Sequence, residues 1–251
     1  MEAMDKFFIR ENRVEGISEN DYKKTELIIS SLKAYARLTY NSIYVIDYYR
    51  KNFLYVSDNP IFLCGYRPDK VKEMGFQFYL NNVPTEELSM LLEINKAGFE
   101  FFNKTSVEER LKLFISYDFH ISNSYNLTLI NHKLTPIVLD GNGNIWLAFC
   151  VVSLSSNRES GNIEVHKDGC QEYWIYSMHK HQWEKQSCIR LTNREKEILL
   201  LSAQGLSEND IYNKIYISTA TIKFHKKSIF NKLCVRNIQS AIIAASNKKL
   251  I

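Results

Sequence analysis

Hydrophobic and polar positions follow one pattern up to about residue 187 and another after it. In the first part, short runs rich in β-branched and aromatic residues predict strands, and segments of helical spacing lie between them. The predicted strands cover residues 42–47, 51–57, 115–121, 125–139 and 145–154. The predicted helices cover residues 21–39, 62–66, 85–102 and 106–114. The Asp-Gly-Asn-Gly sequence at 140–143 predicts a turn between the last two strands.

After residue 187, apolar residues recur at helical spacing, and residues that cap helices separate the segments. Thr192 and the glutamate three positions later have the form of a capping box, so a first helix begins there. Gly205 supplies the left-handed residue that ends it. Ser207 predicts a second helix to about residue 215, and Ser218 a third over 219–233, with a tight connection between them.

The third of these helices has two unlike faces. Its inward apolar residues are Ile222, Ile229, Phe230 and Leu233. The opposite face carries Lys223, Lys227 and Asn231, each four positions from the next. Two short helices, a tight turn and an exposed basic helix are the parts of a helix-turn-helix, whose second helix enters the major groove of DNA.

Charge is distributed unevenly along the 251 residues. From Cys188 onward, eleven basic residues stand against four acidic ones, a net charge of +7. Since the whole chain carries +4, the rest carries −3. A compact basic segment on a mildly acidic body indicates a polyanionic partner for that segment alone.

From Leu191 to about Ile243 the sequence resembles the LuxR-type (NarL-like) helix-turn-helix regulators. The matching positions are Leu191, Thr192, Arg194, Glu195, Glu197, Ile198, Leu199, Ala203, Gly205, Ile211, Ile217, Ser218, Thr221, Ile222, Lys223, His225, Ile229, Lys232, Leu233, Val235 and Ala241. So many spaced matches are far more specific than one short motif. The resemblance implies an all-α, four-helix domain that binds double-stranded DNA and regulates transcription, with RNA polymerase as a further partner.

Carried over position by position, the resemblance makes Lys223, Phe224 and Lys227 the candidates for reading bases. Lysine can donate to guanine N7 and O6, and an exposed phenylalanine can contact a thymine methyl group. The residues implied to contact phosphates are Ser218, Thr219, Thr221 and Lys232. The alternative is that the lysines form an ordinary solvated helix face.

The fourth helix, which Asn237 can cap, pairs two DNA-binding heads in relatives. Ile238, Ile242 and Ala245 lie along one of its faces, and we expect that face to pair across a two-fold axis in a homodimer on DNA. Burial within the same head is the open alternative. The sequence also departs from the family at Ile238, where a basic residue is usual.

Between about residues 40 and 155, two strands, a helical insert and three antiparallel strands resemble a PAS sensor domain. The resemblance implies an α+β fold that holds a small molecule or cofactor between its sheet and its helices. Cys64 lacks the Asn-Cys-Arg-type surroundings of a flavin photoreceptor, so we expect no flavin adduct, and the sequence requires no cofactor. Many aromatic residues in this part indicate either a pocket for a flat effector or an aromatic core. His120 and His132 could be haem ligands, but the ordinary alternation of side chains along a strand explains them as well.

The predicted organisation has four parts. They are an N-terminal helical lead-in (1–39), a PAS-like sensor domain (40–156), a linker or coupling hairpin (157–187) and a LuxR-type helix-turn-helix domain (188–251). The lead-in helix could pack on the sheet or on a partner chain. The third part contains a possible hairpin over residues 163–177, which could transmit the sensor state or simply finish the sheet.

Several other classes of protein fit the sequence less well. There is no signal peptide and no apolar run near 18 residues, so we expect a cytoplasmic protein without membrane contact. The five cysteines lie too far apart for a local metal or redox pair. Common nucleophile, phosphate-binding and zinc motifs do not occur, so we expect no enzyme. A response regulator controlled by phosphorylation and an acyl-homoserine-lactone receptor remain as alternatives.

Overall fold

A computed structural model of the chain describes residues 7–8, 12–122 and 126–251. These residues divide into two compact units. The first extends to Leu154 and includes Glu159–Gln186, and the second comprises Ser155–Arg158 and Ser187–Ile251. The first unit contains an antiparallel sheet with helices, and the second is helical.

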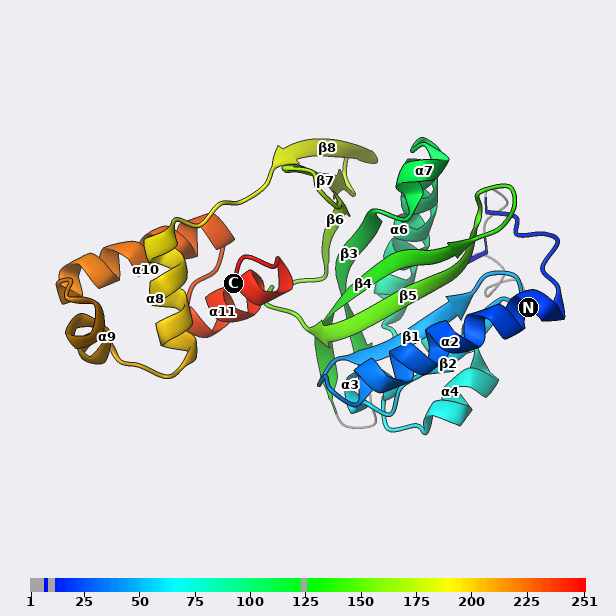
Figure 1. Ribbon diagram of the computed structural model, residues 1–251, viewed down its shortest axis with the longest axis horizontal. Coiled ribbons are helices and arrows are strands. Elements are labelled where there is room, and N and C mark those ends of the chain that lie inside the picture. Colours follow the sequence, from blue (N-terminus) through cyan, green and yellow to red (C-terminus); the bar gives the residue numbers. More distant parts are fainter. Residues whose placement is uncertain (1–6, 9–11, 123–125) are drawn as a thin grey trace. The chain divides into compact units, whose positions relative to one another are not determined.

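The first unit is built on one sheet of eight strands in the order β2-β1-β5-β4-β3-β6-β7-β8 (Figure 1). The strands are β1 (Ser42–Asp47), β2 (Asn52–Val56), β3 (Leu113–Ser122), β4 (Leu127–Leu139), β5 (Ile145–Leu154), β6 (Gly161–Lys167), β7 (Glu172–Ser177) and β8 (Gln182–Ser187). The pairings from β2 across to β7 are antiparallel. Side chains therefore alternate between two faces, with Tyr44 and Ile46 of β1 on one and Val45 on the other.

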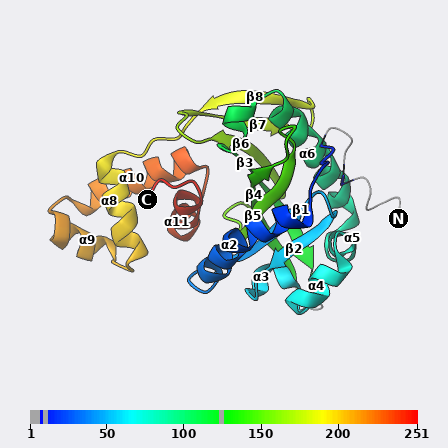
Figure 2. The same cartoon turned by 45° about the vertical axis from the view of Figure 1, so that its right-hand side comes forward.

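Helices cover both faces of this sheet. They are α2 (Glu19–Ala36), α3 (Pro60–Leu63), α4 (Pro68–Met74), α5 (Gln77–Asn82), α6 (Thr85–Asn103) and α7 (Val107–Arg110). Side chains of α3 to α6 pack on the face that bears Tyr44. Figure 2 shows α5 and α6 beyond the strands from α2. On the other face, Ile29 and Leu32 of α2 pack around Val45 and Trp146.

The structure corrects two expectations for the first unit and decides between two alternatives. The helix predicted over 106–114 ends at Arg110, and Phe114 already lies in β3. Residues 161–187 add three strands to the sheet, which agrees with the alternative in which this segment finishes the sheet. The helix predicted over 21–39 ends at Ala36, so Leu38 lies beyond it and is exposed. Within the helix the apolar residues Leu27 and Tyr35 are also exposed, because the stripe that meets the sheet is formed by Tyr22, Ile29 and Leu32.

The second unit consists of four helices. They are α8 (Asn193–Ala203), α9 (Glu208–Ile215), α10 (Thr219–Leu233) and α11 (Ile238–Asn247). Its interior has two apolar clusters, one where α10 meets α8 and α11 around Ile229, and one where α10 meets α8 and α9 around Ile222. Among the residues that the structure describes, no helix in either unit is long and apolar enough to cross a membrane.

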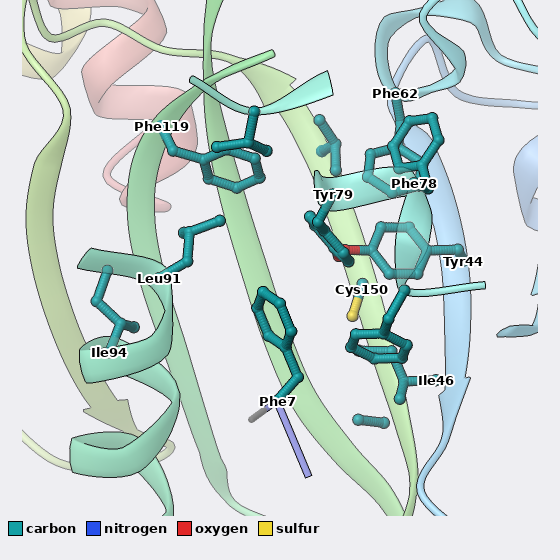
Figure 3. Close-up of a cluster of buried hydrophobic side chains, with 14 of the residues drawn as sticks. Phe7, Tyr44, Ile46, Phe62, Phe78, Tyr79, Leu91, Ile94, Phe119 and Cys150 are labelled. Atoms are coloured by element: carbon teal, nitrogen blue, oxygen red, sulfur yellow. The ribbon is translucent and has the colours of Figure 1, made fainter. Parts of the chain in front are cut away.

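A chain of polar side chains crosses the aromatic core of the first unit. The hydroxyls of Tyr44 and Tyr79 point toward each other from β1 and α5 (Figure 3) and lie 2.5 Å apart. The Tyr44 hydroxyl also lies 2.6 Å from Nε2 of His132, whose Nδ1 has no hydrogen-bond partner among the described residues. Burial lowers the pKa of His132 to about 3, so the imidazole is neutral in the folded unit.

This neutral histidine makes the first unit less stable in acid. In the unfolded chain His132 binds a proton near its ordinary pKa of about 6.5, whereas the folded chain does not bind it until about pH 3. Stability is therefore lost as the pH falls below about 6.5. We expect His132→Leu to have a lower midpoint temperature of unfolding than the wild type at pH 7.5. Between pH 7.5 and pH 4.5, however, its midpoint temperature should fall less than that of the wild type.

Tryptophan fluorescence during thermal unfolding measures this effect, because all three tryptophans of the chain, Trp146, Trp174 and Trp183, lie in the first unit. His179→Leu, at an exposed histidine, is the matched control and should keep the wild-type pH dependence. Equal pH slopes for wild type and His132→Leu would contradict the assignment.

Candidate nucleic-acid interface

Each helix of the second unit begins at a side chain that accepts a hydrogen bond from the helix's own backbone. Thr192 and Glu195 form the predicted capping box, in which the Thr192 hydroxyl accepts from the Glu195 amide at 3.2 Å. Ser207, Ser218 and Asn237 cap α9, α10 and α11 in the same way. The four start points predicted from the sequence are therefore confirmed.

The connection between α9 and α10 depends on a left-handed residue that the sequence does not signal. Tyr216 ends α9 with a φ of 54°, although glycine or asparagine is usual there. Two residues later Ser218 caps α10, and its hydroxyl accepts from the Thr221 amide at 3.1 Å. This tight turn fixes where α10 begins relative to α9.

One buried carboxylate joins the beginning of α8 to the end of α10. The side chain of Glu195 is 3% exposed, and its oxygens accept from the Thr192 amide, the Ser228 hydroxyl and the Lys232 ammonium, each at 2.7 Å. Burial by itself raises the pKa of Glu195, but the hydrogen bonds from Lys232, Thr192 and Ser228 outweigh it and lower the pKa to about 2. The carboxylate is therefore charged and holds α10 against α8.

Lys232 consequently has a different place from the one that the sequence suggested. Its ammonium binds the buried carboxylate of Glu195, whereas the resemblance to LuxR-type regulators implies a contact with a DNA phosphate. The partner lies 37 positions away, and no local pattern links the two. A phosphate contact of Lys232 would have to share the ammonium with Glu195, and it stays a prediction.

The three predicted base readers lie on the exposed side of α10. Phe224 is 70% exposed, an unusual position for a large apolar ring. Lys223 and Lys227 are exposed on either side of it along the helix. In the part of the chain that the structure describes, Lys227 makes no ion pair, while Lys223 lies 3.8 Å from the carboxylate of Glu208 on α9.

The remaining predicted phosphate contacts gather at the beginning of α10. Ser218 and Thr221 are exposed, their hydroxyls lie 2.8 Å apart, and Thr219 is half-buried between them. The first turn of a helix offers free backbone N–H groups and the positive end of the helix dipole. This end of α10 is therefore suited to bind an anion next to the lysine face.

The predicted dimer face of α11 is largely used within the unit. Ala245 is completely buried, and Ile238 and Ile242 pack against the same cluster. Ala245 is thus buried within its own head, which was the open alternative to a dimer contact. Its small side chain lets α11 approach α8 and α10 closely. Ile243 is the exposed large apolar residue of this helix.

Comparison with known proteins identifies the second unit. Residues 190–245 match the family of bacterial regulatory proteins, luxR family. Over 61 residues, the chain is 43% identical to the response regulator protein VraR of Staphylococcus aureus (strain Mu3) and to that of Staphylococcus epidermidis. The match covers 24% of this chain and 29% of the length of these curated relatives. The second unit thus contains a luxR-family helix-turn-helix domain.

Two solved structures illustrate how far the likeness extends. The response regulator ChrA of a heme-sensing two-component system is 40% identical over 27% of this chain and 33% of its own, with a TM-score of 0.24. The VqmA dimer of Vibrio cholerae, described in the absence of target DNA, is 14% identical over 88% of each chain, with a TM-score of 0.34. At these TM-scores neither likeness establishes a shared overall fold.

The buried carboxylate predicts a specific loss of stability in the second unit. We expect Glu195→Gln to lower the free energy of unfolding by about 2 kcal/mol, because it removes the charge that Lys232 and Ser228 bind in a largely buried place. In the wild type this contribution is present above about pH 4.3 and is lost as the pH falls toward 2. Hydrogen exchange of the α10 amides in the full chain measures the change.

Glu197→Gln is the matched control, since Glu197 pairs with Arg194 on the exposed side of the same helix at 2.7 Å. An exposed pair contributes about 0.2–1 kcal/mol at most, so exchange should stay close to that of the wild type. Equal protection of α10 in both variants would show that the Glu195 contacts do not hold the helix.

Proposed function

We propose that the chain is a sequence-specific DNA-binding transcriptional regulator whose second unit binds duplex DNA through α10. The observation that carries the proposal is the exposed face of α10, with Lys223, Phe224 and Lys227, on a domain that matches the luxR family. The apolar side of the same helix is fixed by Ile222, Ile229 and the rest of the interior. Such a helix can present its basic side to the major groove without unfolding.

In this proposal the two exposed lysines read bases by donating to guanine N7 and O6. Phe224 lies between them in sequence and contacts the methyl group of a thymine, which accounts for a large ring left in water. Ser218, Thr219 and Thr221 bind a backbone phosphate at the beginning of the helix, and this contact sets the register. Two heads bind together as a homodimer, and RNA polymerase is the downstream partner.

We further propose that the first unit is a PAS-like sensor for a small effector. The chain runs through two strands (β1 and β2), five helices (α3 to α7) and three antiparallel strands (β3 to β5), which is the order that suggested this fold. Between α6 and the sheet lies an apolar cavity of about 60 Å³, whose lining includes Tyr48, Phe99, Phe102 and Tyr117. The aromatic lining and small volume favour a small, flat and uncharged effector.

The strand arrangement speaks against phosphorylation of a receiver domain. A receiver needs alternating strands and helices around a parallel sheet. The strand pairings described here, from β2 across to β7, are antiparallel. An effector or a partner protein is therefore the better candidate for the signal.

Two experiments test the proposal as a whole. Selection of duplexes from a random library by the full chain should recover a common sequence motif, which then binds more tightly than a shuffled duplex of equal composition. Recovery of no common motif would overturn the DNA-binding function. Native mass spectrometry of the full chain tests the sensor, since a retained small molecule would appear as an added mass.

Single lysine variants separate base reading from phosphate binding. We expect Lys223→Ala and Lys227→Ala each to lose about 1–3 kcal/mol of binding free energy on the selected duplex and to relax the preference at one base pair. Competition binding with single-base variants of that duplex measures both effects. A lysine that only contacts phosphate would weaken all sequences alike and lower the salt slope by about one unit.

Lys196→Ala is the matched control, because it removes the same charge from an exposed position on α8. It should leave the base preference unchanged. If it relaxed the preference as much as Lys223→Ala, the effect would come from net charge and not from a contact of α10.

A further inference from the structure

The basic side of α10 faces one acidic residue, Glu208, the first residue of α9. Its two carboxylate oxygens bind different lysines, with Lys223 Nζ 3.8 Å from Oε2 and Lys226 Nζ 3.3 Å from Oε1. The glutamate side chain is only 31% exposed. A negative charge thus lies within the surface that the proposed function gives to DNA, where it repels phosphates.

The other three acidic residues after Cys188 have partners away from the proposed reading face. Glu195 binds Lys232 in the interior, Glu197 pairs with Arg194 within α8, and Asp210 completes the cap of its own helix with Ser207. None of these contacts involves the lysines of the proposed reading face. Glu208 differs from them because it binds a proposed base reader, Lys223.

The two lysines hold Glu208 unequally. Lys226 is 16% exposed and lies closer to the carboxylate, so it is a lasting counter-ion between α9 and α10. Lys223 is 70% exposed and its contact with the carboxylate is long, at 3.8 Å, so this contact can be exchanged for shorter hydrogen bonds. Guanine O6 and N7 can accept two such bonds from one ammonium, and only the correct sequence places them within reach.

We propose that Glu208 is a specificity-determining positioning residue of the DNA-binding surface. It acts through Lys223, which it holds away from phosphates until a base acceptor replaces Glu208 as the partner of the ammonium. On a wrong sequence Lys223 stays with Glu208 and contributes little, and the carboxylate repels the backbone. Specificity thus comes partly from a repulsive element, and this proposal rests on the proposed function of α10.

The test compares Glu208→Gln with Glu197→Gln in the full chain. Both variants remove one negative charge from the same unit, but only the first releases Lys223 and Lys226. The probes are the duplex selected by the wild type and a shuffled duplex of equal composition. We expect Glu208→Gln to reduce the ratio of the two affinities about fivefold, mainly by tighter binding of the shuffled duplex.

Salt dependence gives a second readout on the shuffled duplex. Lys223, once released from Glu208, contacts a phosphate, so the plot of log K against log salt should steepen by about one unit. Glu197→Gln should leave the ratio of affinities close to that of the wild type. Equal ratios and equal slopes for both glutamine variants would show a general effect of net charge and would overturn the role of Glu208.

A double-mutant cycle with Lys223→Gln tests whether Glu208→Gln acts through Lys223 or only damages the packing of α9. If Glu208 acts through Lys223, Glu208→Gln should change the affinity ratio much less in a chain that already lacks Lys223. Damage to the packing of α9 would change both backgrounds alike, and that result would overturn the inference. A wild-type chain that selects no duplex at all would instead remove the proposed DNA-binding function, before Glu208 comes into question.

Discussion

The geometry of the second unit depends on the carboxylate of Glu195 and the three groups that bind it. Through the Thr192 amide this residue closes the first turn of α8, and through Ser228 and Lys232 it holds the second half of α10. Apolar packing around Ile229 holds the same two helices but is not directional. The hydrogen bonds add a fixed rotation of α10 about its axis, which decides which residues face outward.

The lysines of α10 illustrate how one residue type serves different purposes in neighbouring positions. Lys232 stabilises the interior with Glu195, Lys226 joins α9 to α10 through Glu208, and Lys227 is exposed for a partner. The net charge of +7 after Cys188 therefore overstates the charge that is available to DNA. Placement decides the role, because an ammonium that already has a carboxylate partner releases fewer counterions from DNA.

Local features of the chain could be predicted from the sequence, whereas distant contacts could not. The caps at Thr192, Ser207, Ser218 and Asn237 are confirmed, because a capping side chain and its amide lie within three residues of each other. The pairing of Lys232 with Glu195 links residues 37 positions apart and left no local signal. Ala245 was assigned to a partner surface because periodicity identifies an apolar face and does not say what covers it.

The interior of the first unit sets physical limits on how it could sense an effector. Hydrogen bonds link Tyr44 to Tyr79 and to His132 in a largely aromatic core, and these directional bonds favour one arrangement of the rings. An effector can change the free-energy difference between two states of the protein only by the difference between its binding free energies for those states. A small apolar molecule in a cavity of about 60 Å³ gains little differential energy from its own surface. A larger response requires that the effector move the rings that line the cavity. Tyr117 is one of these rings, and its centroid lies 4.7 Å from that of His132, so a displaced Tyr117 would disturb the hydrogen bond between His132 and Tyr44.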